Sequence, residues 1–224
     1  MPNLCVAGCS FSDYVKTDKV YGEYLAEILG MNYIHQGAGV GSNWRIWRKV
    51  YDHIKQGLIT SNDLLIVQYT ISERQEFYSR FRDDEEQTMS MPYREPYGDG
   101  DIVRYKMDSY KWQKFDQDRQ FFKMYQDDHV NIEFAEEQFE CHHTMFQHFL
   151  LSNNITTIFF KSAYRYDLDL LPEFEQISFQ KRDCSDPPYN LSKGDTSHMN
   201  QEGHKALSSL LFDHIKLKLP RLVK

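Results

Sequence analysis

The sequence contains no long apolar run. None of its hydrophobic segments approaches the roughly 20 residues that a helix needs to cross a bilayer. The first ten residues, MPNLCVAGCS, also lack the basic start and the extended apolar stretch of a signal peptide. We therefore expect a cytoplasmic protein with no membrane partner.

Cysteine is scarce and forms no motif. The four cysteines, Cys5, Cys9, Cys141 and Cys184, include no Cys-x-x-Cys pair. Cys5 and Cys9 lie on one expected strand, about 13 Å apart, which is too far for a disulfide bond. We interpret all four as reduced thiols, consistent with the cytosol.

Metal-binding and nucleotide-binding motifs are also absent. His142 and His143 stand beside Cys141, but consecutive helical residues point about 100° apart, and no second pair has the spacing of zinc ligands. The glycine-rich segment GAGVGSN at 37–43 matches neither a P-loop nor the Gly-x-Gly-x-x-Gly fingerprint. We expect no metal and no other cofactor.

The chain has no excess of basic residues. It carries 33 Asp and Glu against 26 Lys and Arg, a formal net charge of −7 at pH 7. Because phosphate backbones are bound by clusters of Arg and Lys, nucleic acid is not an expected partner. The length of 224 residues, 41% of them hydrophobic, suits a single α/β domain with a proper core.

Hydrophobic periodicity predicts strands alternating with helices, which favours a mainly parallel sheet covered on both faces. We expect strands at 4–7, 32–35, 63–69 and 155–161. Four helices are expected: one that ends at Gly30, one that is capped by Ser42 or Asn43 and closed by Gly57, and two over about 132–152 and 201–219. Their expected apolar faces include Val20, Tyr21, Tyr24, Leu25, Ile28 and Leu29; Trp44, Trp47, Val50, Tyr51 and Ile54; Ala135, Phe139, His142, Phe146 and Phe149; and Leu207, Leu210, Leu211, His214 and Leu217.

Residues 78–128 break this alternation. They show no clean period and are rich in charged and aromatic residues, among them Tyr93, Trp112 and Phe115. A connection between elements needs far fewer residues. We interpret the stretch as an insertion that forms a lid, a subunit contact in a homo-oligomer, or a wall of the binding site.

Small and polar residues follow three of the expected strands. Ser10 follows the first strand, the glycine run follows the second, and Thr70 follows the third. In an open parallel sheet, ligands bind beyond the carboxyl ends of the strands. The three segments therefore indicate one crevice.

A base for Ser10 is available near the other end of the chain. Asp195 and His198 are three residues apart, so on a turn that enters a helix both side chains can face the same way. His198 can then take the proton of Ser10 while Asp195 orients the imidazole, as in a serine hydrolase. Asn200 and Gly203 are typical of the start of the last helix.

These motifs resemble a known family. GCSFS at 8–12, GAGVGSN at 37–43 and Asp195-x-x-His198 followed by MNQEGH are similar to the first, second and fifth sequence blocks of the SGNH, or GDSL-like, hydrolases. The resemblance implies a flavodoxin-like three-layer α/β/α sandwich with a mainly parallel five-stranded sheet. It also implies ester hydrolysis without a metal by a triad of Ser10, Asp195 and His198.

The resemblance also implies an oxyanion hole. Its donors are the backbone N–H of Ser10 and that of Gly39 or Gly41, between which the sequence does not choose. The family's third block, Gly-x-Asn-Asp, is missing, because this chain continues Gln-Tyr-Thr-Ile-Ser after the central strand. Thr70 is the nearest substitute for the missing asparagine.

Two further residues are candidates for substrate binding. Asn43 is a helix cap or a remoter oxyanion donor, and Arg74 is expected at the crevice rim in an ion pair with Glu73 or Glu76. The segments 42–46 and 70–74 resemble a divergent branch of the family that includes viral sequences.

The combined reading is a serine esterase that removes a short acyl group, such as acetyl, from a carbohydrate or a similar small polar substrate through an acyl-enzyme. Two alternatives remain open. One is an acyltransferase on the same fold. The other is a binding or structural module that has lost useful turnover, which the altered third block would explain.

Overall fold

The computed structural model describes residues 1–9, 12–14, 17–37, 42–70, 75–78, 88–91, 132–161, 168–177, 190–192 and 195–223. At 75–78, 88–91, 132, 161, 175–177, 190–192 and 195–198 it describes the backbone without the side chains. Most of the expected insertion at 78–128 therefore lies outside the described residues.

A parallel sheet forms the centre of the fold. β1 (Asn3–Gly8), β2 (Asn32–Gly37), β3 (Leu64–Tyr69) and β6 (Thr156–Lys161) have six residues each, and β7 (Glu175–Ile177) adds a short edge of three. The strand order is β2-β1-β3-β6-β7, and each neighbouring pair is parallel. This is the flavodoxin-like order, which confirms the expected sheet.

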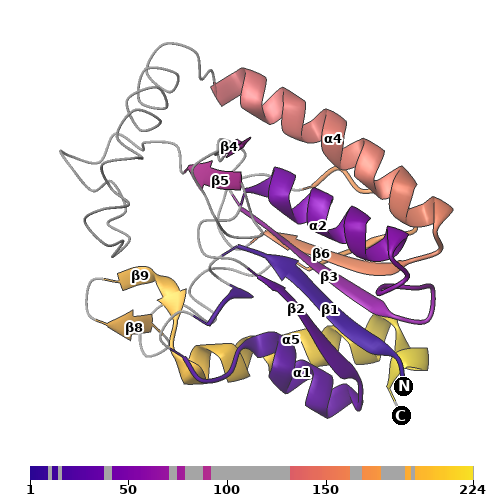
Figure 1. Cartoon of the computed structure of the whole chain (residues 1–224). Coiled ribbons are helices and arrows are strands. Elements are labelled where there is room, and N and C mark those ends of the chain that lie inside the picture. The colour runs from indigo at the N-terminus through magenta and orange to yellow at the C-terminus, as the bar shows by residue number, and fades with distance from the viewer. Residues whose placement is uncertain are drawn as a thin grey trace.

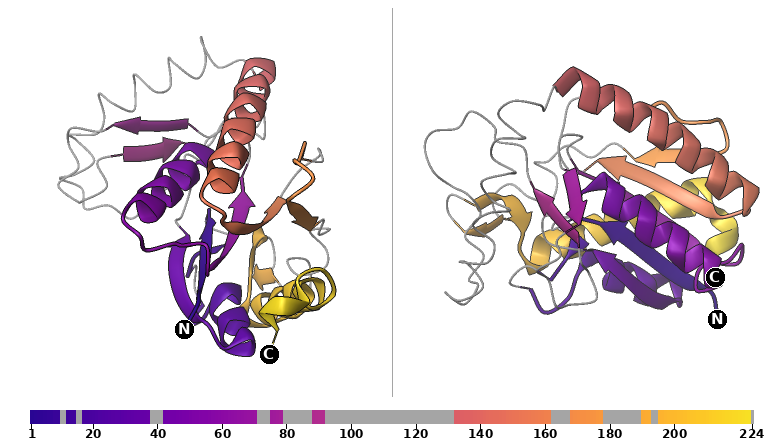
Figure 2. Two further views of the ribbon diagram at one scale, coloured as in Figure 1. Left: turned by 90° about the vertical axis from the view of Figure 1, so that its right-hand side faces the viewer. Right: turned by 45° about the horizontal axis from the view of Figure 1, so that its top comes forward.

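Four helices cover the two faces of the sheet. α1 (Tyr21–Leu29) and α5 (Gln201–Lys218) lie on one face, and α2 (Asn43–Lys55) and α4 (Ile132–Ser152) on the other (Figure 1, Figure 2). The predicted three-layer α/β/α sandwich is thus confirmed. A short 3-10 helix, η3 (Pro220–Leu222), follows α5. None of the helices described here combines the length and the apolar character that crossing a bilayer requires.

Two small antiparallel sheets were not expected from the sequence. β4 (Gln75–Tyr78) pairs with β5 (Thr88–Met91), and β8 (Asn190–Ser192) pairs with β9 (Asp195–Met199). β4 and β5 bracket the start of the expected insertion. β9 leads directly into α5.

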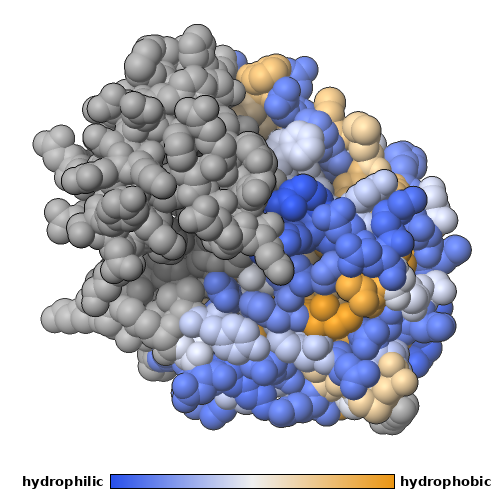
Figure 3. Space-filling model, in the orientation of Figure 1, coloured by the Kyte–Doolittle hydropathy of each residue, from blue (hydrophilic) through white to orange (hydrophobic). Residues whose placement is uncertain are grey.

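Alternation along the central strands divides the core in two. Leu4 and Val6 of β1 face α1 and α5, whereas Cys5 and Ala7 face α2 and α4. β3 follows the same rule, since side chains alternate across a strand. The inner strands are buried on both faces, which explains their nearly continuous apolar sequences. The described part of the face in Figure 3 is mostly hydrophilic.

The helix ends follow local sequence signals. Gly30 ends α1 with φ 65°, the left-handed conformation that glycine adopts without strain. Ser42 caps α2, because its side chain accepts a hydrogen bond from the Arg45 N–H at 3.1 Å. Asn200 caps α5 through the Gly203 N–H at 2.9 Å, as expected.

The apolar faces of the helices were predicted less well. Trp44 and Tyr51 of α2 are 43% and 46% exposed, and their rings contact His142 and Phe149 at the margin of α4. In α4, His143 is fully buried where His142 was expected. The other expected core positions that prove exposed are Ile28, Leu210 and Leu217. In α4 and α5 hydropathy alone was insufficient, because the buried His143 and His204 have hydrogen-bond partners inside the core.

Gly22 allows α1 to approach the sheet closely. A Cβ at this position would lie 2.5 Å from Tyr33 Cε2 and 2.8 Å from Val6 Cγ2. Helix propensity favours Gly22→Ala by about 1 kcal/mol, but overpacking costs about 1–3 kcal/mol. We expect the variant to lower the free energy of unfolding measured in urea. In a Tyr33→Ala background the same change should cost less stability, because only the contact with Val6 Cγ2 remains. A higher urea midpoint for Gly22→Ala alone would contradict the prediction.

Candidate functional site

The carboxyl ends of β2, β1 and β3 lie side by side. Gly8 of β1 pairs with Gly37 of β2, and Ala7 pairs with Val67 of β3. The chain leaves β1 towards α1 on one face and leaves β2 towards α2 on the other, so the connections diverge at this edge (Figure 1). Ligands in open α/β sheets bind at such a switch point, where the sequence placed the site.

Several predicted site residues lie outside the described part of the chain. They are Ser10, Gly39, Gly41 and Arg74. The backbone of Asp195 and His198 is in β9, immediately before α5, rather than on the expected turn. The triad and the oxyanion donors from the backbone therefore stay predictions.

The described residues do join the two distant ends of the chain. Gln201 at the start of α5 donates hydrogen bonds to the backbone oxygen of Lys19 at 2.9 Å and to the Tyr24 hydroxyl. The N–H of Tyr21, the first residue of α1, donates to His204 Nδ1 at 3.2 Å. The start of α5, which follows His198, is thus hydrogen-bonded to the start of α1, which follows Ser10 in the chain.

Core packing joins the same two segments. Cys9, the last described residue before position 10, and Met199, the residue after His198, are 3% and 1% exposed and belong to one core cluster. The N-terminal and C-terminal blocks of the predicted site therefore share one hydrophobic core.

Asn43 and Thr70 form a two-way clamp. The Thr70 N–H donates to Asn43 Oδ1 at 3.0 Å, and Asn43 Nδ2 donates to the Thr70 carbonyl at 3.2 Å. Both residues are buried. The start of α2 is thereby fixed to the end of β3. The role of Thr70 in an oxyanion hole and the role of Asn43 in substrate binding remain predictions.

Gln68 is a buried polar residue at this edge that the sequence did not single out. It is fully buried in β3, and its Oε1 accepts hydrogen bonds from the Cys9 N–H at 3.2 Å and the Ser12 hydroxyl at 2.8 Å. The signal was present in the sequence: LLIVQY is an apolar strand with a single amide. An amide in a strand buried on both faces needs partners.

The described cysteines are free thiols, as predicted. Cys5 and Cys9 are buried and Cys141 is exposed. Burial, with a smaller contribution from the Asp63 charge, raises the pKa of Cys5 to about 12. Because the thiolate is the reactive form, Cys5 is a packing residue. Cys184 lies outside the described residues.

The two adjacent histidines of α4 have separate structural partners. His142 Nδ1 lies 2.7 Å from the Gln138 carbonyl, and His143 Nδ1 lies 3.0 Å from the Tyr69 hydroxyl. Burial raises the pKa of Tyr69, which keeps the phenol protonated. Trp47 Nε1 donates to the Tyr69 oxygen at 3.0 Å. This chain ties α2, β3 and α4 together, and no cluster of three metal-binding side chains occurs among the described residues.

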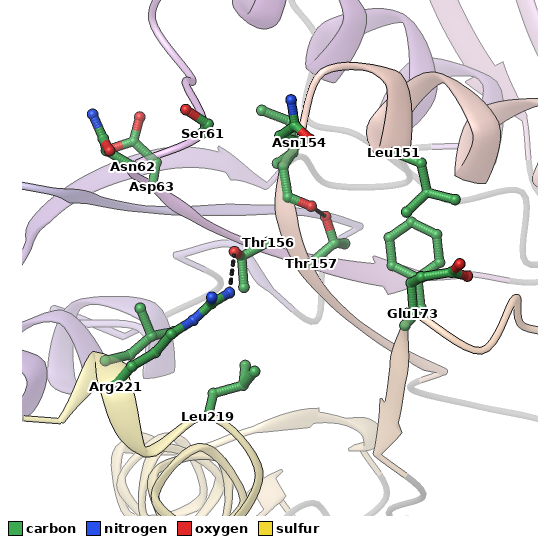
Figure 4. Close-up of a pocket in the computed structure, with 13 residues that line it drawn as sticks. Ser61, Asn62, Asp63, Leu151, Asn154, Thr156, Thr157, Glu173, Leu219 and Arg221 are labelled. Atoms are coloured by element: carbon green, nitrogen blue, oxygen red, sulfur yellow. Dashed lines mark hydrogen bonds between the residues drawn. The ribbon is translucent and has the colours of Figure 1, made fainter.

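A cavity of about 470 Å³ lies at the opposite end of the sheet. Its wall is formed by residues that precede β3, the start of β6 and the C-terminal segment (Figure 4). Arg221 Nη2 lies 3.3 Å from Thr156 Oγ1 across its mouth. Because the cavity borders the amino ends of the strands, it is separate from the predicted site.

Comparisons with known proteins give matches at the level of structure alone. No protein-family model matches the sequence, and no curated protein matches it. A solved structure from Desulfitobacterium hafniense, assigned as a lipolytic protein of the G-D-S-L family, is similar with a TM-score of 0.51 and 10% identity. The match covers 94% of this chain and 98% of that one.

Two further solved structures give weaker matches. A lipase from a goat rumen metagenome has a TM-score of 0.49 and 10% identity, over 95% of this chain and 97% of that one. A protein from Bacteroides fragilis, assigned as an acylhydrolase, has a TM-score of 0.47 and 12% identity, over 97% and 88%. At these identities the likeness concerns the fold. The strand order, the three layers and the match to the G-D-S-L protein show that this chain has the SGNH, or GDSL-like, hydrolase fold.

Proposed function

We propose that this protein is a serine ester hydrolase of the SGNH type. The observation that supports it most is the register of the sheet edge. β2, β1 and β3 are adjacent and parallel, and they end together, so the glycine run, Ser10 and Thr70 all follow one edge of the sheet. An open α/β sheet binds its ligands at that edge.

In the proposed reaction, Ser10 attacks the ester carbonyl. His198 takes the proton of the hydroxyl and returns it to the leaving alcohol, while Asp195 orients the imidazole. Water then attacks the acyl-enzyme with His198 again as the base, which releases the acid and restores Ser10. The hydrogen bonds between the starts of α5 and α1 support this pairing of distant segments.

The oxyanion that forms during attack needs fixed donors. We assign this role to the backbone N–H of Ser10 and that of Gly39 or Gly41, with Thr70 in place of the missing asparagine. The two hydrogen bonds with Asn43 support this role of Thr70, because they hold both its backbone N–H and its carbonyl group. Donors that are held in advance cost no reorganisation during the reaction.

The proposed substrate is a short acyl ester, such as an acetyl group, on a carbohydrate or a similar small polar alcohol. The support for ester chemistry is the resemblance of the sequence blocks, together with the assignment of the similar Desulfitobacterium hafniense structure as a lipolytic protein of the G-D-S-L family. The preference for acetyl groups and carbohydrates comes from the resemblance alone.

A fluorophosphonate probe tests the proposal. We expect it to label the protein on Ser10, located by mass spectrometry, and the purified protein to hydrolyse p-nitrophenyl acetate. Ser209→Ala, a change at an exposed serine of α5, should be labelled like the wild type. Absence of both labelling and hydrolysis would overturn the proposal in favour of a binding module. Acyl transfer to an added sugar in excess of hydrolysis would replace it with an acyltransferase.

A further inference from the structure

We propose that Gln68 is the positioning residue for the turn that carries Ser10. This inference rests on the proposed function, since it takes Ser10 as the nucleophile. It adds a residue of the central strand to the catalytic arrangement, acting through the backbone on either side of positions 10 and 11.

Gln68 stands where β3 passes beside the end of β1. Leu4 pairs with Leu64, and continuing this register places Gln68 beside Gly8. The side chain of Gln68 falls on the α1–α5 face, following Leu64 and Ile66 in the alternation of the strand. Its hydrogen-bond partners Cys9 and Ser12 lie in the segment between β1 and α1.

The two ends of the Gln68 amide hold different parts of the molecule. The oxygen accepts from the Cys9 N–H at 3.2 Å and from the Ser12 hydroxyl at 2.8 Å. The nitrogen donates to the Tyr69 carbonyl at 2.8 Å and contacts Cys9 Sγ at 3.3 Å. This pattern fixes the amide orientation, because two donors face the oxygen and a carbonyl faces the nitrogen.

Two glycines leave room for the turn that joins Cys9 to Ser12. A Cβ on Gly8 would lie 2.7 Å from Gln68 Oε1, and a Cβ on Gly37 would lie 2.6 Å from the Ser12 carbonyl oxygen. β1 and β2 therefore each place a glycine beside this turn, and β3 places the Gln68 amide there. The Ser12 N–H also donates to the Cys9 carbonyl at 2.9 Å, which closes the chain on itself.

The same hydrogen bonds continue towards the segment that carries the base. Ser12 Oγ donates to Gln68 and therefore accepts from the Tyr21 hydroxyl at 2.8 Å. The Tyr21 N–H donates to His204 in α5. Gln68 thus anchors a chain of contacts from the central strand through the turn to α5, six residues beyond His198.

The expected consequence is a change in turnover without a change in binding. Misplacing a reacting group by about 1 Å costs roughly 100-fold in rate. Q68M keeps the length of the side chain but none of its hydrogen bonds. We expect kcat for p-nitrophenyl acetate and the rate of fluorophosphonate labelling to fall together by about 10- to 100-fold, with KM within about twofold.

Q68E is the conservative variant. At this fully buried position the carboxyl group is kept protonated, so one oxygen still accepts from Cys9 and Ser12 and the O–H can donate to the Tyr69 carbonyl. We therefore expect kcat to recover several-fold relative to Q68M. Ile215→Ala provides a stability control, since Ile215 is fully buried on the same face but far along α5. This control should lower the melting temperature and leave kcat of the folded enzyme unchanged.

The outcomes separate the two proposals. A wild type that the probe labels on Ser10, with Q68M folded and its kcat within twofold of the wild type, overturns the role of Gln68 alone. A wild type that shows neither labelling nor hydrolysis overturns the proposed function. If Q68M does not fold, S12A removes one of the bonds to Gln68 and should lower kcat by about threefold to tenfold. An unchanged kcat in S12A would then overturn the inference.

Discussion

Replacing Ser10 by alanine is expected to lower kcat for ester hydrolysis by about 10³- to 10⁶-fold, and adding His198→Ala should cost almost nothing further. Residues that act as a unit in nucleophilic catalysis are not additive, since the base has no task once the hydroxyl is gone. The measurement is steady-state hydrolysis of p-nitrophenyl acetate by the wild type, both single variants and the double variant.

The control for this cycle is a histidine with a structural role. His142 lies on α4, where its Nδ1 contacts the Gln138 carbonyl, so His142→Ala should leave kcat close to the wild-type value. Additive losses for Ser10→Ala and His198→Ala would mean that the two residues act independently. The proposed pairing of the chain ends would then be wrong.

Gly8→Ala is expected to lower both stability and activity. The new Cβ would lie 2.7 Å from Gln68 Oε1 and 2.9 Å from Ser12 Cβ, and closer still to the Ser12 hydroxyl oxygen. Overpacking of this kind costs about 1–3 kcal/mol, to which the strained hydrogen bonds of Cys9 and Ser12 add. Urea unfolding measures the first effect and the labelling rate of Ser10 the second.

A second-site change tests the cause of this effect. Ser12→Gly removes two of the three atoms that the Cβ of Gly8→Ala would meet, so Gly8→Ala should cost less stability in the Ser12→Gly background than in the wild type. Gly57→Ala is the matched control. Gly57 has φ 71° and no atom within 4 Å of its ideal Cβ, so it should lose about 1–2 kcal/mol from backbone strain and no activity. Equal labelling rates for Gly8→Ala and the wild type would contradict the prediction.

Features that depend on neighbouring residues in the chain were predicted well. The ends of α1 and α5 follow from Gly30 and Asn200, because a left-handed glycine and a side-chain cap act within one turn of helix. The parallel sheet follows from apolar runs that alternate with amphipathic segments. Periodicity also predicted that the three segments of the proposed site follow the carboxyl edge of the strands, and the structure shows that β2, β1 and β3 end at one edge.

The exact faces of the helices were not predictable in this way. Hydropathy assigned His142 of α4 to the core, whereas the structure buries His143 because the Tyr69 hydroxyl is there to bind it. Similarly, His204 is buried in α5 because it accepts the first N–H of α1. A polar residue can occupy a core position only where a distant segment supplies its partner.

The sequence by itself determined the class of fold and the residue types available for chemistry, since both depend on local periodicity and on motifs a few residues long. Only the tertiary structure decided how the edge is built. Gln68 can reach its hydrogen-bond partners only because β1 lies beside β3. Gly8 and Gly37 have no room for a side chain because Ser12 packs closely against them. These contacts join residues far apart in the chain, so their energies depend on distances that exist only after the sheet has formed.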